Sequence, residues 1–313
     1  GFRETMILIN TRPVWNLGPN IWNRELRRNL NPGITLLSAP TQEISLYGEK
    51  KIDTLLMKRQ IQFLLSCEVK KKIILFTSPT SVEAFFKIFK KRSFLHGCYD
   101  SLQSKKEFVE KTESFFWAKR NRLTFGAIGK GTARRFFELS AGLLNDRYYL
   151  ERDNLKMLYV EREATGQRWV EEFSEKIRSS FVAVMEGKEN SVSLVRSIKV
   201  HSSRVLSFRI YKRKNLIDRA ASLTLANKIS LITKASLSSA GRKQPVGILV
   251  SSTSTITRVR CLIERLQESE RLIVISHHDK ILSQVKKIHG RISCIRVKSL
   301  NPANVSEEID NLL

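Results

Sequence analysis

The sequence is poor in cysteine, in long apolar runs and in acidic residues. Its four cysteines, Cys67, Cys98, Cys261 and Cys294, are scattered and form no Cys-x-x-Cys pair, which favours free thiols in a reducing cytoplasm over metal ligands or disulfides. No apolar run approaches the ~20 residues of a membrane-spanning helix, and residues 1–5 lack the apolar core of a signal peptide. We therefore expect a cytoplasmic protein without a membrane partner.

The shortage of acidic residues leaves a strongly basic chain. It has 55 Lys and Arg against 30 Asp and Glu, a formal net charge of +25, which is typical of nucleic-acid-binding proteins. However, the basic residues are spread along the chain in short clusters such as 212–214, and neither zinc-finger spacing nor a ribonucleoprotein aromatic motif is present. We expect no stable nucleic-acid partner. Two explanations of the charge stay open: basic residues on solvent-exposed faces, and attraction of a polyanionic small ligand.

One strand–loop–helix pattern organises the rest of the chain. The apolar run 73–76 ends in the loop Thr77-Ser78-Pro79, and apolar residues then recur at helical spacing from Val82. Thr80 and Glu83 fit a capping box, which predicts the start of the helix. The loop follows the carboxyl end of a predicted strand, which is where open α/β sheets bind their ligands.

The pattern recurs three times. Residues 246–250 run into a loop of serine and threonine at 251–255 and then into a helix, and further strand–loop–helix units are predicted at 123–142 and 272–290. The 313 residues suffice for about two domains. Because the four units form two similar halves, the sequence predicts the α/β fold class with two parallel sheets.

Apolar patterns predict the remaining elements. Further strands are expected at 6–10, 34–37, 147–150, 157–160, 181–185, 204–211 and 292–297, and further helices at 15–30, 52–66, 169–177, 216–237 and 306–313. Residues 93–122 are polar and basic and are expected to form a peripheral loop and helix. The strand at 204–211 alternates and ends at Tyr211, just before the basic cluster 212–214.

The sequence offers no motif for a metal or a nucleotide. His277 and His278 are adjacent but lack carboxylate or cysteine partners at ligand spacing. Gly129-x-Gly131 lacks both the Gly-Lys-Ser/Thr ending of a P-loop and the third glycine of a dinucleotide fingerprint. We therefore expect no cofactor and no bound metal.

Five short motifs follow one another along nearly the whole chain. They are Thr11-Arg12-Pro13 after the first strand, Pro40, Phe76-Thr77-Ser78 with Val82, Ile128-Gly129-Lys130-Gly131-Thr132-Ala133, and Ile210-Tyr211-Lys212-Arg213. In this order the set resembles the uroporphyrinogen-III synthase family. The chain departs from the family pattern at 276–280, where the glycine and threonine of a family loop are absent, and at 186–189, where a longer family motif is shortened.

The resemblance implies two doubly wound, flavodoxin-like parallel-sheet domains, joined by a two-stranded linker with a cleft between them. Residues 1–38 and 214–313 would form the first domain, residues 41–210 the second, and residues 39–40 and 211–213 the linkers. The implied activity is that of a monomeric cytoplasmic lyase of haem biosynthesis. It would cyclise and dehydrate the small molecule hydroxymethylbilane with inversion of ring D, giving uroporphyrinogen III without a cofactor.

The implied substrate is a linear tetrapyrrole that carries many carboxylates. Backbone N–H groups at helix N-termini and arginine side chains both bind carboxylates. The expected substrate-binding residues are Thr11, Arg12, Thr77, Ser78, Pro79, Val82, Gly129, Lys130, Thr132, Ser251 and Ser252. For the hydroxyl residues among them, helix capping alone is an equally good explanation.

Tyr211 is the expected catalytic residue. A phenol can protonate a departing hydroxyl group that lies within hydrogen-bond reach, and we expect this side chain to project into the cleft. A tyrosine that only packs between the domains is the alternative. Two other classes of function also stay open, a non-catalytic two-domain α/β binding protein and a basic nucleic-acid-binding protein.

Overall fold

The computed structural model describes residues 5–16, 20–47, 51–66, 71–90, 106–107, 110, 123–141, 157–162, 164–188, 192–235 and 244–311. The chain separates into two compact units, one made of Gly1–Ile44 and Lys214–Leu313 and the other of Ser45–Arg213. Parallel strands alternate with helices in both, so the predicted α/β class is confirmed. The domain limits expected from the sequence stay a prediction about separately folding domains.

The sheet of the first unit is parallel throughout. It contains β1 (Met6–Asn10), β3 (Ile34–Ser38), β10 (Pro245–Leu249), β11 (Arg271–Ser276) and β12 (Ser293–Arg296), in the order β12-β11-β10-β1-β3. Read from β3 and numbered along the chain, this is 2-1-3-4-5, the flavodoxin-like order. The strand order reverses between β1 and β10, whose carboxyl ends lead into Thr11 and Val250.

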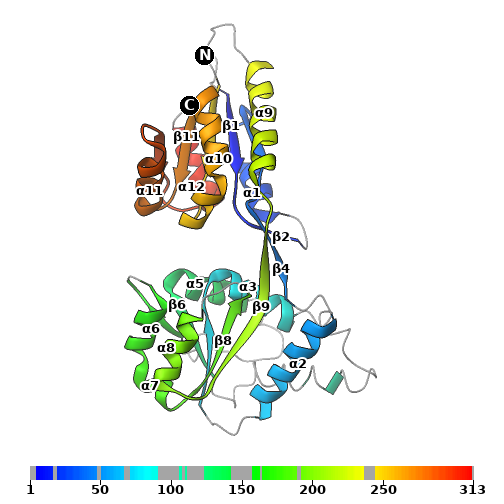
Figure 1. Ribbon diagram of the computed structural model, residues 1–313, viewed down its shortest axis with the longest axis vertical. Coiled ribbons are helices and arrows are strands. Elements are labelled where there is room, and N and C mark those ends of the chain that lie inside the picture. Colours follow the sequence, from blue (N-terminus) through cyan, green and yellow to red (C-terminus); the bar gives the residue numbers. More distant parts are fainter. Residues whose placement is uncertain are drawn as a thin grey trace. The chain divides into compact units, whose positions relative to one another are not determined.

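Helices cover both faces of this first sheet (Figure 1). One face packs on α9 (Arg219–Ala235), α10 (Thr253–Ser269) and α11 (Asp279–His289), through a core that includes Ile7 and Leu262. The other face packs on α1 (Ile21–Asn29) and α12 (Pro302–Asp310), through a core that includes Leu8 and Leu26. The strands are apolar on both faces because helices bury both, as in other doubly wound sheets.

The sheet of the second unit has the other common doubly wound order. Its parallel part contains β5 (Lys72–Phe76), β6 (Thr124–Gly129), β7 (Met157–Val160), β8 (Phe181–Gly187) and β9 (Val205–Asn215). The complete strand order is β2-β4-β9-β8-β5-β6-β7. Read from β7 and numbered along the chain, the parallel part is 3-2-1-4-5. The strand order reverses between β5 and β8.

The chain passes between the two units along β9 and β4 (Gln42–Leu46). These strands run antiparallel, because the amide of Leu216 donates to the carbonyl of Thr41 and the amide of Tyr47 to that of Ile210, both at 3.0 Å. Strand β2 (Val14–Trp15) pairs with β4. The sequence predicts no strand at β4, whose five residues include only two apolar ones. It also ends the last strand of this unit too early, since β9 continues beyond Tyr211.

Helices also cover both faces of the second sheet (Figure 1). On one face, α3 (Pro79–Lys90) and α5 (Lys130–Ser140) enclose a cluster of phenylalanines, in which the rings of Phe125 and Phe136 lie 4.7 Å apart. On the other face, Trp169 and Ile198 pack under α6 (Gly166–Glu172), α7 (Ser174–Arg178) and α8 (Ser193–His201). Helix α2 (Lys51–Ser66) contacts β9, where Gln60 Nε2 donates to the carbonyl of Ser207 at 3.0 Å.

Some predicted limits are wrong. The helix expected at 15–30 begins at Ile21, because Val14–Trp15 is a strand and Asn20 caps the helix by accepting from the amide of Asn23 at 3.0 Å. The last helix begins at Pro302 rather than at residue 306, since proline suits the first turn of a helix. The helix expected at 216–237 begins at Arg219, and that expected at 169–177 is divided into α6 and α7.

The other predicted strands and helices are confirmed where the structure describes them. The strand expected at 147–150 and most of the segment 93–122 lie outside the described residues. Within the part of the chain that the structure describes, no helix is both long enough and apolar enough to cross a membrane.

Candidate functional site

One loop lies at the reversal of strand order in the second sheet. β5 is followed by Thr77, whose amide and hydroxyl groups both donate to the carbonyl of Met185 in β8, at 3.3 and 3.2 Å. Open α/β sheets bind ligands at such a reversal, outside the carboxyl ends of the strands. The structure therefore holds the loop after β5 against the end of β8, at the place in the sheet that favours a ligand.

Ser78 caps the helix that follows this loop. The amide of Ser81 donates to Ser78 Oγ at 3.2 Å and the amide of Ser78 donates to Ser81 Oγ at 3.1 Å, a reciprocal capping box. The predicted box of Thr80 and Glu83 is wrong, because α3 begins one residue after Ser78 and Glu83 instead accepts from Arg135 Nε at 2.9 Å. Ser78 therefore caps α3, and its oxygen also lies close to a second hydroxyl group.

A β-bulge turns Tyr211 to the other face of β9. Glu186 of β8 lies beside Arg209, but the next residue, Gly187, lies beside Tyr211, so Ile210 is one extra residue in β9. In a regular strand Tyr211 would share the face of Arg209; the extra residue puts it on the opposite face. The exposure agrees, because Arg209 is exposed whereas Ile210 and Tyr211 are 0% and 2% exposed.

Tyr211 fits on this face because Gly187 has no side chain. A Cβ atom at Gly187 would lie 2.7 Å from Tyr211 Cε2 and 3.1 Å from the phenol oxygen. That oxygen lies 3.3 Å from Ser78 Oγ, within hydrogen-bond distance. Strands β5, β8 and β9 thus bring together two hydroxyl groups that are 133 residues apart in the sequence.

A cation completes this group. The guanidinium carbon of Arg213 lies 5.4 Å from the centroid of the Tyr211 ring, and Arg213 Nη2 donates to Thr80 Oγ1 at 3.5 Å. A guanidinium over an aromatic ring makes a cation–π contact, and its planar fork is suited to carboxylates. We call Ser78, Thr80, Gly187, Tyr211 and Arg213 the tyrosine site. The sequence does not single out Gly187, because its role depends on the pairing of β8 with β9, and it assigns no role to Arg213, which only ends the motif of Tyr211.

The tyrosine site combines a proton donor with a positive charge. A phenol hydroxyl both donates and accepts hydrogen bonds, as does a serine hydroxyl. When Tyr211 gives its proton to a ligand, the Ser78 hydroxyl can therefore donate a hydrogen bond to the phenol oxygen. Tyr211 is 2% exposed, and its hydroxyl lies 3.3 Å from that of half-buried Ser78. This arrangement suits acid catalysis on an anionic substrate.

The other expected residues of the second unit differ in exposure. Pro79 and Lys130 are exposed, whereas Val82 and Thr132 are 0% and 6% exposed and belong to the packed interior. Gly129 caps α5, and a Cβ atom there would lie 2.6 Å from Ala164 Cβ, so this position has room only for glycine. Of these residues, Lys130 alone presents a charged side chain at the surface.

Thr11 joins strand ends in the first unit. Its hydroxyl donates to the carbonyl of Leu249, and its own carbonyl accepts from the amide of Thr41 at 3.1 Å and from the Thr41 hydroxyl at 3.0 Å. Thr11 is 0% exposed. Its side chain therefore holds β1 against β10 at the reversal of strand order.

Arg12 lies on the indole ring of Trp22. The guanidinium carbon is 4.7 Å from the ring centroid, and Arg12 Nη1 donates to the carbonyl of Leu300 at 3.4 Å. Trp22 Nε1 donates to the same carbonyl at 2.7 Å. Stacking of this kind orients a guanidinium and limits its motion, so Arg12 is held in one place at the carboxyl edge of the sheet.

Ser251 and Ser252 follow β10. Ser252 caps α10 by accepting from the amide of Thr255 at 3.3 Å. Ser251 is half-buried. A role of either serine in binding a substrate stays a prediction.

His277 lies near Arg12 at the end of β11. Burial, the adjacent His278 and the charge of Arg12 together lower the pKa of His277 below its usual 6.5. From the sequence alone, His277 stands out only as a candidate metal ligand, because its electrostatic contact with Arg12 joins distant parts of the chain. Among the residues that the structure describes, no three or more His, Cys, Asp or Glu side chains are grouped to hold a metal ion.

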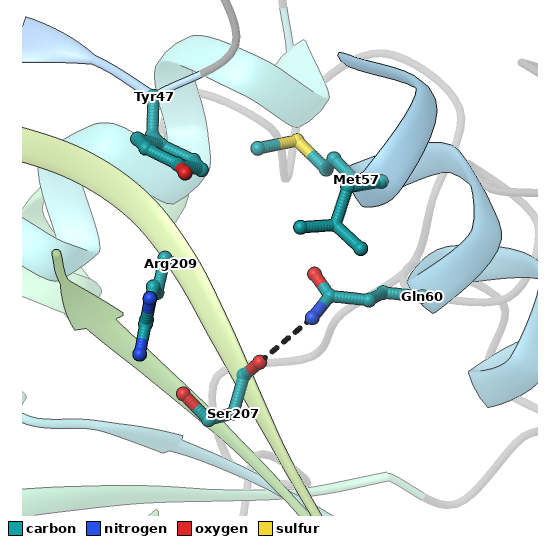
Figure 2. Close-up of a pocket in the computed structure, with 6 residues that line it drawn as sticks. Tyr47, Met57, Gln60, Ser207 and Arg209 are labelled. Carbon is teal, nitrogen blue, oxygen red and sulfur yellow. Dashed lines mark hydrogen bonds between the residues drawn. The ribbon is translucent and has the colours of Figure 1, made fainter. Parts of the chain in front are cut away.

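A cavity of about 200 Å³ lies on the Arg209 face of β9 (Figure 2). It is lined by Tyr47, Leu56, Met57, Gln60, Ser207 and Arg209. The Gln60 amide reaches across to the backbone of Ser207, as the dashed line in Figure 2 shows. The sequence does not predict this cavity, because α2 and β9 contribute to it from distant parts of the chain. Because the bulge at Ile210 puts Tyr211 on the other face of β9, the cavity and the tyrosine site lie on opposite faces of this strand.

No protein-family model matches the chain, and no curated protein sequence matches it. Among solved structures, the chain is similar to a mutant uroporphyrinogen III synthase from the extremely thermophilic bacterium Thermus thermophilus, with a TM-score of 0.47 and 12% identity over 98% of this chain and 99% of that one. The wild-type Thermus protein gives a TM-score of 0.38 at 13% identity, over 96% and 97% of the two chains.

The chain is also similar to uroporphyrinogen-III synthetase from Helicobacter pylori, with a TM-score of 0.44 and 12% identity over 96% of this chain and 99% of that one. At such identities and TM-scores these likenesses assign neither a family nor an activity to the chain.

Proposed function

We propose that this chain is a uroporphyrinogen-III synthase, which closes hydroxymethylbilane into uroporphyrinogen III with loss of water and inversion of ring D. The observation that supports the proposal best is the contact between the Ser78 and Tyr211 hydroxyls, 3.3 Å apart. These residues come from two of the motifs that carry the sequence resemblance. They meet at the reversal of strand order, where a doubly wound sheet favours a ligand.

Tyr211 acts as the general acid in the proposed reaction. The bond between carbon and the departing hydroxyl breaks with its electron pair going to that oxygen, the phenol proton joins it, and water leaves. Ring D attacks the resulting cationic carbon and loses a proton as the macrocycle closes, and a proton returns to the Tyr211 phenolate. Ser78 orients the phenol through the hydroxyl–hydroxyl contact. General acid help of this kind contributes ~10²–10⁴ in rate.

The remaining task is to position the two ends of the substrate. Unassisted closure gives the uninverted isomer, so the protein must direct attack to the substituted carbon of ring D. Correct positioning alone can lower a barrier by ~7–11 kcal/mol in favourable cases. The substrate carries carboxylates, for which Arg213 and Lys130 in the second unit and Arg12 in the first are the proposed cationic partners.

The proposal includes three expectations from the sequence. The enzyme works as a monomer, it is cytoplasmic, and it needs neither a metal nor a nucleotide. Activity should therefore persist in the presence of a strong chelator and without added cofactor, as measured by the rate of product formation before and after dialysis.

The decisive experiment is an isomer assay. Freshly prepared hydroxymethylbilane is incubated with the purified chain, the products are oxidised to porphyrins, and the two isomers are separated by chromatography. We expect the inverted isomer to predominate. If the products match those of the reaction without protein, in isomer ratio and in rate, the chain does not have this activity.

The nucleic-acid alternative makes a different prediction. Binding that depends on phosphate contacts weakens steeply as salt rises. If the isomer assay fails and the chain binds DNA or RNA with such a salt dependence, the net charge of +25 serves nucleic-acid binding instead.

A further inference from the structure

A buried carboxylate lies next to the tyrosine site. Glu186 is 6% exposed in β8, and its Oε1 accepts a hydrogen bond from the hydroxyl of Ser207 in β9. Burial raises the pKa of Glu186, while the Ser207 hydrogen bond and the charge of Arg209 oppose this rise. An ionised carboxylate is expensive to bury, so its position needs an explanation other than stability.

The place of Glu186 in the sheet suggests that explanation. Glu186 lies beside Arg209, and the following residue, Gly187, lies beside Tyr211 and receives its ring. The extra residue, Ile210, stands between these two pairs. Glu186 therefore holds β9 immediately before the point at which the strand changes the face of its side chains.

We propose that Glu186 is a positioning residue for Tyr211. Its carboxylate holds Ser207 and Arg209 on one face of β9, which fixes the bulge at Ile210 and keeps the Tyr211 hydroxyl against the tyrosine site on the other face. The inference builds on the proposed function, because it concerns the same tyrosine.

The charge of the Glu186 carboxylate determines how strongly it holds Ser207 and Arg209. Ser207 and Arg209, both on β9, are the groups that act on its ionisation. Lys188, two residues further along β8, is exposed. The residues of α2 that line the cavity beside Ser207 and Arg209 are Leu56, Met57 and Gln60, which carry no charge. Protonation of Glu186 replaces a charge-assisted hydrogen bond by a weaker neutral one and removes its attraction to Arg209.

The first test observes Tyr211 without requiring turnover. Ring carbons of all tyrosines are labelled with ¹³C, and the Tyr211 resonance is identified by its loss in Tyr211→Phe. In the wild-type chain we expect this resonance to shift as the pH falls from about 8 to 5, with a midpoint above the usual 4.5 for glutamate. In Glu186→Gln the shift should disappear. A Tyr211 resonance that is the same in both proteins at every pH overturns the proposal.

The second test measures turnover. Glu186→Gln keeps the shape of the side chain but removes its charge, and we expect kcat to fall about tenfold, since small displacements of a reacting group have large effects on rate. KM should change by less than about twofold, because the phenol acts on the reacting centre rather than on binding. The acid limb of the pH–kcat profile should flatten in the variant.

Two further variants serve as a replacement and as a control in these tests. Ser207→Ala removes the same hydrogen bond from the β9 side, so it should lower kcat in the same direction if Glu186→Gln proves difficult to fold. Glu270→Gln is the matched control, because Glu270 Oε1 accepts from the Ser230 hydroxyl at 3.0 Å in the first unit. It should leave kcat, its pH profile and the Tyr211 resonance unchanged.

The outcomes separate the two proposals. If the wild-type chain fails the isomer assay but the Tyr211 resonance follows the ionisation of Glu186, the proposed function fails and the structural link stands. If the isomer assay succeeds and Glu186→Gln has the kcat and pH profile of the wild type, the positioning role fails and the function stands.

Discussion

The two sheets use the hydroxyl groups at their carboxyl ends in different ways. In the first sheet, Thr11 and Ser276 donate to the backbone carbonyls of Leu249 and Val250, and thereby tie neighbouring strands together. In the second sheet, the Thr77 hydroxyl likewise donates to the carbonyl of Met185, but the hydroxyls of Ser78 and Tyr211 face each other. A hydroxyl engaged with a backbone carbonyl is structural, whereas two facing hydroxyls keep the capacity to bind a further group. Changes at Thr11 or Ser276 should therefore affect stability, and changes at Ser78 or Tyr211 should affect turnover.

The largest expected difference concerns Tyr211. Tyr211→Phe removes the proposed acid but keeps the ring against Gly187, so we expect kcat to fall about 10²-fold, near the low end for general acid help. The inverted isomer should still predominate, because many other contacts position the substrate. Initial rates and isomer ratios from the chromatographic assay measure both effects.

Two other results for Tyr211→Phe would change this interpretation. Unchanged kcat with an unchanged melting temperature removes Tyr211 from the mechanism. A large fall in melting temperature identifies it as a packing residue. Ser276→Ala is the control from the first sheet: it leaves the buried carbonyl of Val250 without its partner, which destabilises the fold by ~1–3 kcal/mol and leaves kcat as it is.

Gly187→Ala should have the next largest effect. The new Cβ atom would stand 2.7 Å from Tyr211 Cε2, so the ring must leave its present position, in which its hydroxyl contacts Ser78. We expect about a tenfold fall in kcat and a loss of ~1–3 kcal/mol of stability, as in other overpacked sites. Gly131→Ala is the control, because a Cβ atom at Gly131 meets nothing within 4 Å. Equal losses in the two variants would show that crowding of Tyr211 is not the cause.

The sequence predicts the two sheets better than it predicts the tyrosine site. Apolar runs such as Ile73–Phe76 and Val246–Leu249 identify strands because helices bury both of their faces. By contrast, β4 is short and has only two apolar residues, Ile44 and Leu46, so no pattern distinguishes it from a loop. Periodicity thus records burial, and it fails where a strand is held mainly by backbone hydrogen bonds.

The tyrosine site shows a second limit of sequence reasoning. Alternation along β9 puts Tyr211 on the face of Arg209, and only the pairing of β8 with β9 reveals the extra residue at Ile210. Glu186 and Gly187 acquire their roles through that bulge, so no local motif selects them, and the motif that contains Arg213 assigns it no role. Tyr211 and Ser78 were accessible to prediction because each belongs to a motif of its own.

A smaller difference is expected between two helix caps. Ser78→Ala and Asn301→Ala each remove a side chain that caps a helix, Ser78 in the second unit and Asn301 in the first. Each should lower the free energy of unfolding by ~0.5–2 kcal/mol. Only Ser78→Ala should also lower kcat, by a few-fold, because only Ser78 contacts Tyr211. If Asn301→Ala lowers kcat as much, the loss reflects stability, and Ser78 has no part in the mechanism.

The smallest expected effect is an opposite pH dependence of stability at half-buried His277 and buried Glu186. The pKa of His277 in the first unit is below its usual 6.5, so below about pH 6.5 the unfolded chain binds more protons at this residue than the folded chain does. Its contribution to stability therefore falls as the pH drops through that range. The pKa of Glu186 in the second unit is above its usual 4.5, so the folded chain binds more protons there. Its contribution rises as the pH drops through the raised pKa.

Urea unfolding between about pH 5 and 7.5 tests both signs. Relative to the wild type, His277→Gln should gain stability toward acid pH, because glutamine does not titrate, whereas the wild-type histidine is protonated more readily in the unfolded chain than in the folded one. Glu186→Gln should be most stable relative to the wild type at neutral pH, where the wild-type carboxylate is ionised and buried. This gain in the free energy of unfolding should disappear toward acid pH. Differences from the wild type that do not vary with pH would contradict both shifts. Glu186→Gln would then combine higher stability with slower turnover, as expected for a charge that positions a catalytic group at the expense of the fold.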